Sequence, residues 1–225
     1  MVGTVPAPVP LPRRPFRARP PVRPPSEPDE AGDAGEAVRL WYEEALGWPT
    51  ASGRPVRLAV GERFDVLDVP AEAGHAALER LERAGHAGQG FPVALGGGRM
   101  RLLVAAGSAE ELPGLLDWLD WGSLELDLAA IGAGGLMEAP SPPGRGAAAG
   151  RPLPPGRDGS QGAAEWLRPP EPGREVEASL PTLSAMGGRP GAPDLVRLVN
   201  TVATQVHRVR LRRACAEPRV ASQAP

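Results

Sequence analysis

The segment Phe64-Asp-Val-Leu-Asp-Val69 continues through Pro70 into Ala71–Ala84, so that a strand pattern passes directly into a helix pattern. The first part is short and rich in valine, and Pro70 lacks the backbone N–H that would continue a strand. The second part repeats apolar residues at helical spacing and is followed by Gly85, a residue typical of helix ends. This junction predicts a domain that combines strands with helices.

Similar patterns extend along the chain in both directions. Toward the N-terminus, Ala37–Leu46 has helical spacing and Arg57–Val60 is typical of a strand. Ser108 and Glu111 form a capping box at the start of a further helix. The remaining predicted elements are strands at 91–95, 100–105, 123–128 and 166–167, and an amphipathic helix at 194–213. This alternation predicts an α/β (α+β) fold, a small mixed sheet with flanking helices.

Glycine and proline supply 29 residues each, and where they concentrate we expect no packed core. They divide the chain into five predicted regions. These are a disordered Pro/Arg-rich tail at 1–36, a folded domain at 37–168 with a Pro/Gly-rich loop at 139–162, a linker at 169–193, a C-terminal helix at 194–213 and a disordered tail at 214–225.

Charge and cysteine content narrow the class of protein. The net charge is −2, so any basic contact with nucleic acid must be local. Cys215 is the only cysteine, which fits a reducing compartment. The N-terminus has no apolar signal-peptide core, and no apolar run is long enough for a membrane span. We therefore expect a soluble cytoplasmic protein with no membrane partner. Its bias toward Ala, Arg, Gly and Pro is typical of a high-GC bacterial genome.

Five short motifs follow one another between residues 37 and 168. They are Gly47-Trp48-Pro49 after a helix, Val66-Leu67-Asp68-Val69-Pro70 on a strand, Gly97-Gly98-Arg99-Met100 entering a strand, Asp127 with the later Gly134–Ser141, and Trp166. In this order they resemble the N-terminal domain of bifunctional DNA primase/polymerases, the prim-pol branch of the archaeo-eukaryotic primase superfamily. The resemblance implies an RRM-like fold.

The resemblance also implies two-metal nucleotidyl transfer, in which strand carboxylates hold two divalent ions. The matching acids are Asp68 and Asp127, with Glu125 as a same-face neighbour on the predicted strand. The second acid of the family's strand pair corresponds to Pro70, and its phosphate-contacting histidine to Met100. We interpret the three acids as a vestigial set. We expect no cofactor unless this set still holds a divalent metal, Mg²⁺ or Mn²⁺.

The end of the predicted C-terminal helix is rich in arginine: Arg208, Arg210, Arg212 and Arg213. Cations there stabilise the negative end of the helix dipole, and the same cluster fits a phosphate backbone; both interpretations stay open. The first functional hypothesis is a non-catalytic, degenerate prim-pol-like accessory module that binds single-stranded nucleic acid or nucleotides. The alternative is a protein-interaction module whose Pro-rich tail recruits partners. A third is a residual metal-dependent nucleotidyltransferase.

Overall fold

The computed structural model describes residues 30–85, 90–143, 164–173, 176–183 and 194–216. Parts of the predicted tails, loop and linker lie outside these residues. The described helices are α1 (Glu30–Leu40), α2 (Ala71–Arg83), α3 (Ser108–Trp118) and α4 (Leu195–Ala216), with a π-helical turn at Trp41–Ala45 and a 3-10 turn at Val176–Ser179. The described strands are β1 (Thr50–Ala51), β2 (Arg57–Ala59), β3 (Asp65–Pro70), β4 (Val93–Gly96), β5 (Arg99–Val104), β6 (Ala129–Ile131), β7 (Leu136–Glu138) and β8 (Glu165–Arg168).

The larger sheet has five strands in the order β6-β3-β5-β4-β8. From β3 to β6 the chain runs β-α-β-β-α-β with β3 and β5 in the middle, which is the split βαβ arrangement found in RRM-like domains. The predicted α+β fold and its C-terminal helix are therefore confirmed. A mixed sheet was predicted, but every strand pairing in this sheet is antiparallel.

A two-residue hairpin fixes the register of β4 and β5. Gly97 and Gly98 both have positive φ, 59° and 75°, as a tight turn between antiparallel strands requires. The pairing of β5 with β3 then places residue 101 opposite Asp68 and residue 99 opposite Pro70. Since successive side chains of a strand alternate between faces, positions 99 and 101 share the face of Asp68, and position 100 lies on the other.

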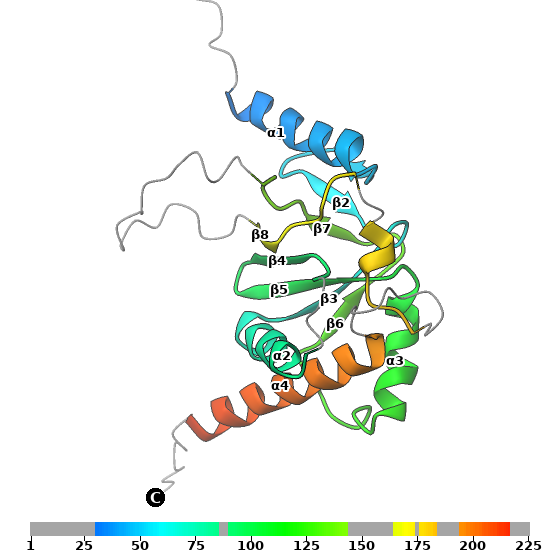
Figure 1. Ribbon diagram of the computed structural model, residues 1–225. Helices are drawn as coiled ribbons and strands as arrows, with labels where there is room; N and C mark the ends of the chain where they lie inside the picture. The colour runs from blue at the N-terminus through cyan, green and yellow to red at the C-terminus, as the bar shows by residue number, and fades with distance from the viewer. Residues whose placement is uncertain (1–29, 86–89, 144–163, 174–175, 184–193, 217–225) are drawn as a thin grey trace, which may run out of the picture.

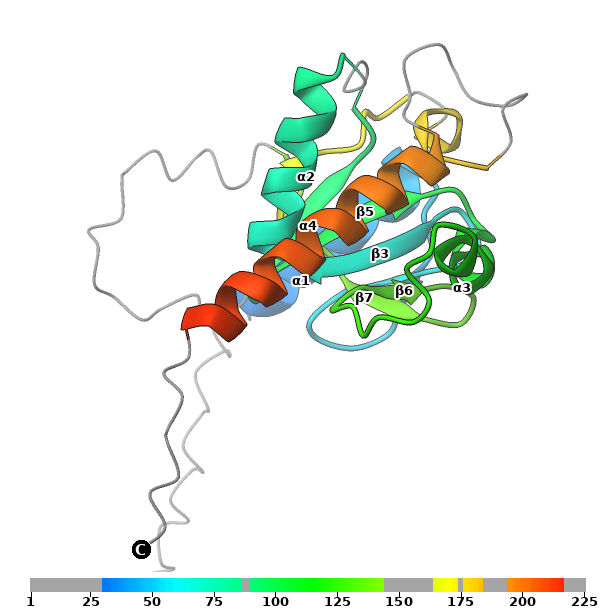
Figure 2. The same cartoon turned by 90° about the horizontal axis from the view of Figure 1, so that it is seen from below.

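Three helices cover one face of the larger sheet. In Figure 2, α4 crosses this face diagonally between α2 and α3. The small sheet β1-β2-β7 and α1 lie on the opposite side (Figure 1). The buried side of α4 is apolar and belongs to the same core as β3 and β5, where Val66, Leu67, Leu102 and Leu103 are all fully buried. The α4 residues in this core are Leu195, Leu198, Val199, Val202, Val206 and Val209.

Aromatic side chains form one part of the hydrophobic core. Tyr42 and Trp48 are buried in the same hydrophobic core, and the Trp48 ring lies 4.5 Å from that of Phe64. The Tyr42 hydroxyl donates to the carbonyl of Pro140 (2.7 Å) and accepts from the Trp166 indole N–H (2.9 Å). These contacts join segments far apart in the sequence. Both polar groups are satisfied, which removes the cost of burying them.

One predicted helix start and one predicted helix cap differ from the structure. Helix α1 begins at Glu30 rather than Ala37. Helix α3 begins at Ser108 as predicted, but the predicted capping box is wrong, because Gly107 is the N-cap residue and no side chain of the capping position bonds to the helix. The first turn is satisfied from β3 instead: the Asp65 carboxylate accepts from the Ala109 N–H at 2.8 Å. A helix end capped from a distant strand leaves no local sequence pattern.

The strand predicted at 123–128 is also wrong, since the paired residues are those of β6, Ala129–Ile131. Residues 121–128 form turns and irregular chain instead. Leu126 and Leu128 pack partly against the core while Glu125 and Asp127 are exposed. Exposed and partly buried side chains therefore alternate here as they do in a strand, although these residues pair with no neighbouring strand. The two acids point outward and bind arginines of β5 and α4.

Candidate nucleic-acid interface

Asp68 is surrounded by arginines at the end of the β3–β5 pair. The Arg99 Nε donates to Asp68 Oδ1 at 2.5 Å, and the Arg101 Nε donates to Asp68 Oδ2 at 3.3 Å. Arg99 also reaches Asp127, with 2.6 Å between Nη1 and Oδ1. Asp127 comes two residues before β6, which pairs with the other side of β3. A single guanidinium thus bridges two of the three predicted vestigial acids.

The electrostatics of this cluster are balanced. Burial alone would lower the pKa of Arg99, but its hydrogen bonds to Asp127 and Asp68 raise that pKa above the ordinary arginine value. Two arginines face two carboxylates, so the cluster is neutral as a unit. One donor is left over: the Nη1 atom of Arg101 is buried without a hydrogen-bond partner among the described residues.

The three predicted acids do not converge on a common ion position. Asp68 and Asp127 meet through Arg99, and Glu125 faces Arg210 of α4. Within the described ranges, no group of three or more His, Cys, Asp or Glu side chains has the geometry of a metal site. A divalent ion at Asp68 would compete with both guanidinium groups for the carboxylate oxygens. The present arrangement therefore favours a structural ion-pair network.

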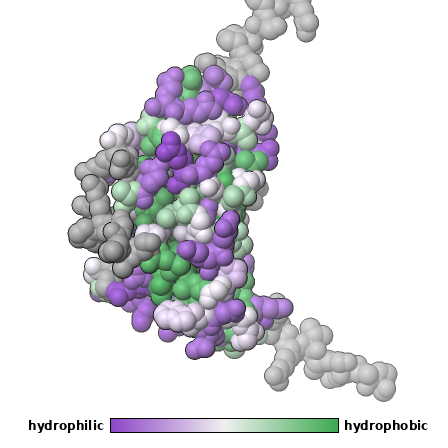
Figure 3. All heavy atoms as spheres, turned by 90° about the vertical axis from the view of Figure 1, so that its right-hand side faces the viewer, coloured by the Kyte–Doolittle hydropathy of each residue, from purple (hydrophilic) through white to green (hydrophobic). Residues whose placement is uncertain are grey.

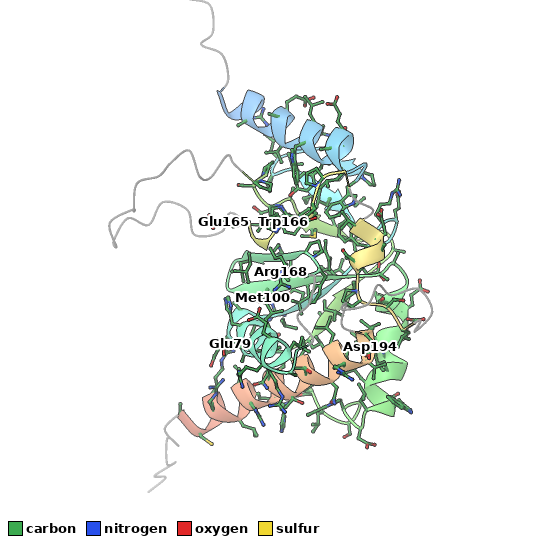
Figure 4. All side chains as sticks on the ribbon, viewed as in Figure 1. Glu79, Met100, Glu165, Trp166, Arg168 and Asp194 are labelled. Carbon is green, nitrogen blue, oxygen red and sulfur yellow. The ribbon has the colours of Figure 1, made fainter. Side chains whose placement is uncertain are left out.

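Met100 does not lie beside Asp68. It is fully buried on the opposite face of the sheet and packs against α2, where a Cβ built on Gly74 would approach its Sδ to 2.3 Å (Figure 4). The side chain opposite Asp68 is that of Arg101. Met100, the position matched to the phosphate-contacting histidine of the family, therefore lies on the face of the sheet opposite Asp68, because strand alternation turns residue 100 away from the acid.

Three of the four arginines predicted to contact nucleic acid bind carboxylates of neighbouring elements. Arg212 Nη2 lies 2.9 Å from Glu72 Oε1, and Arg213 Nη2 lies 3.6 Å from Glu72 Oε2. Arg210 Nη2 lies 3.7 Å from Glu125 Oε2, and Arg210 Nη1 also donates to the Glu125 carbonyl. Arg208 is exposed and has no carboxylate partner among the described residues.

A groove of about 460 Å³ separates the last turns of α4 from the segment before β6. Predicted acids and predicted arginines both line it, since its polar groups come from Glu125, Asp127, Arg210 and Arg213. Its apolar lining residues are Pro70, Leu126, Val206, Val209 and Ala214. The structure therefore unites the two residue sets that the sequence placed about eighty positions apart.

Sequence reasoning missed three charged residues of this region: Arg99, Arg101 and Glu72. A signal for the first pair was present, because two arginines spaced by two residues on a strand share one face and a carboxylate stood on the neighbouring strand. Glu72 carried no such signal. It lies in the first turn of α2, where an acid is explained by the helix dipole alone.

No family model matches the chain, and searches of curated proteins and of solved structures found no match. Among the described helices, none combines the length and the apolar character needed to cross a membrane.

Proposed function

We propose that this chain is a non-catalytic module that associates with single-stranded nucleic acid, and that it is a degenerate, cytoplasmic relative of the prim-pol domain. The observation that carries the proposal is the positive charge on the last turns of α4. Four arginines gather there against the two carboxylates of Glu72 and Glu125, an excess of two positive charges. The whole chain has net charge −2, so this excess is local.

The ion pairs of Asp68 with Arg99 and Arg101, here called the charged end of the sheet, support the non-catalytic part of the proposal. Metal-assisted nucleotidyl transfer needs carboxylate oxygens that are free to coordinate divalent ions. Both carboxylate oxygens of Asp68 accept from arginines, and the partner position Pro70 carries no acid. We therefore expect no primer extension with Mg²⁺ or Mn²⁺. Template-dependent extension that is lost in an Asp68→Asn variant would contradict this.

Binding of a fluorescently labelled single-stranded oligonucleotide, followed by anisotropy over a salt series, tests the proposal. Each arginine–phosphate contact adds about 0.7 to the slope of log affinity against log salt for a single strand. The double variant Arg208→Gln/Arg212→Gln is expected to bind about tenfold more weakly, with a slope smaller by roughly 1 to 2.

The matched control is Arg80→Gln/Arg83→Gln, which removes the same charge from exposed positions near the other end of α2. It is expected to change the affinity less than about twofold, because distant surface charges are screened. Equal weakening by both double variants would mean that net charge, and not the α4 cluster, governs binding. No binding at about 50 mM salt, where such contacts are strong, would contradict the proposal.

The alternative, a protein-interaction module, is favoured by one observation. Trp118 at the end of α3 is 71% exposed, an unusual position for a large aromatic side chain. Figure 3 shows an apolar area in the lower half of the face on which α3 lies. If oligonucleotide binding fails, a pull-down comparing the wild type with Trp118→Ala tests this second candidate.

A further inference from the structure

Three arginines in the last turns of α4 pair with glutamates that a bound polyanion would have to displace. Glu72 on α2 binds Arg212 and Arg213, and Glu125 in the segment before β6 binds Arg210. The two glutamates belong to different elements, and Glu125 lines the groove beside the helix. The Arg-rich turns are therefore attached to the body of the domain at two separate points.

These attachments are exposed. The side chains of Arg210, Arg212 and Arg213 are 50%, 64% and 60% exposed, and those of Glu72 and Glu125 are 52% and 96% exposed. Exposed ion pairs contribute little to stability because water and salt compete with them. The apolar stripe of α4, which ends at Val209, holds the helix in place independently of them. The guanidinium groups can consequently change partners without loss of the fold.

A phosphate backbone competes for the same donors. Arginine pairs with carboxylates and phosphates through the same fork of N–H groups, so one guanidinium cannot serve both fully. The glutamates also repel an approaching phosphate. Both effects weaken binding of a polyanion to this cluster.

We propose that Glu72 and Glu125 are built-in competitors that lower the affinity of the α4 arginines for nucleic acid, an inference that rests on the proposed function above. Binding then exchanges internal carboxylates for phosphates. Arg208, which has no carboxylate partner among the described residues, needs no such exchange.

The test is oligonucleotide affinity of the full chain carrying Glu72→Gln/Glu125→Gln, measured by anisotropy at low and moderate salt. Glutamine keeps the size of the side chain and removes the charge. The control is Glu79→Gln/Glu111→Gln, which removes the same charge from exposed positions of α2 and α3. We expect the first double variant to bind on the order of tenfold more tightly than the wild type, and the control to gain about twofold or less.

The outcomes separate this inference from the proposed function. If the wild type binds and both double variants gain equally, the glutamates act only through net charge and the inference is overturned while the function stands. If the wild type fails to bind and only Glu72→Gln/Glu125→Gln binds, the glutamates compete as inferred, but the proposed function of the wild-type chain is contradicted. If no variant binds at low salt, the inference and the proposed function fall together. Thermal unfolding of each variant verifies that all of them are folded.

Discussion

The two halves of α4 are held in different ways. The first half presents Leu198, Val199 and Val202 to the core, where each is fully buried. The last turns carry arginines whose contacts are exposed ion pairs with Glu72 and Glu125. Burial of apolar surface is worth kilocalories per residue, whereas an exposed pair is worth about 0–1 kcal/mol. One helix thus joins a fixed structural half to a half whose partners are exchangeable.

The largest effect is expected in the buried half. Leu198→Ala should lower the free energy of unfolding by about 2–5 kcal/mol, because it leaves a cavity among α4 and its neighbours. Leu211→Ala, at a position that is 50% exposed, should change it by less than about 0.5 kcal/mol. Urea denaturation measures both. Similar losses at the two positions would show that both halves of α4 are held by apolar burial.

A smaller effect is expected at the charged end of the sheet. Asp68→Ala removes the acceptor of Arg99 and Arg101, and the Asp68 side chain is only 14% exposed, so we expect a loss of about 1–3 kcal/mol. Asp127→Ala removes a partner that is 55% exposed and should cost about 1 kcal/mol or less. If Asp68→Ala instead stabilised the domain, Asp68 would be better understood as a retained ligand site than as part of a structural network.

The pH dependence of stability sharpens the contrast between buried and exposed acids. Burial raises the pKa of the Asp65 carboxyl, and the nearby Glu110 adds to the rise, although backbone N–H groups of Ala109 and Gly107 oppose it. The folded state then holds this proton more firmly than the unfolded state. Stability from Asp65 is therefore greatest below the ordinary aspartate pKa of about 3.9 and falls as pH rises through the higher folded value.

Asp65→Asn removes this titration and keeps an oxygen that can accept from Ala109. The free energy of unfolding of the variant, relative to the wild type, should therefore rise between about pH 4 and neutral pH. Urea titrations at several pH values measure the difference. If the wild type instead becomes more stable relative to the variant as pH rises, the folded protein stabilises the Asp65 carboxylate, and the raised pKa is contradicted.

The smallest effect is expected in the exposed half of α4. Arg212→Gln should lower the free energy of unfolding by no more than about 1 kcal/mol, and the difference should shrink in roughly 1 M salt. The measurement is thermal or urea unfolding at two salt concentrations. A larger, salt-insensitive loss would mean that the last turns are part of the core and cannot change partners freely.

The sequence predicted much of the fold because periodicity and turn residues are local. The strand of Asp68, helix α2 and the hairpin at Gly97-Gly98 follow from such patterns. The cap of α3 by Asp65 and the position of β6 were missed, since both depend on contacts between distant segments. For the site, the sequence singled out the acids and the α4 arginines, and the structure places members of both sets around one groove. That Arg99 bridges Asp68 to Asp127, and that Met100 faces away, follows only from the register of β3 with β5.

The most direct test of the central claim is a titration of the isotopically labelled full chain with a single-stranded oligonucleotide, followed by NMR. Signals of the last turns of α4, including the arginine side chains, are expected to change first, and those of Glu72 and Glu125 are expected to change with them. Signals of Asp68, Arg99 and Arg101 should change little. Changes centred on those three sheet residues, with α4 unaffected, would contradict the account and return the charged end of the sheet to the role of binding site.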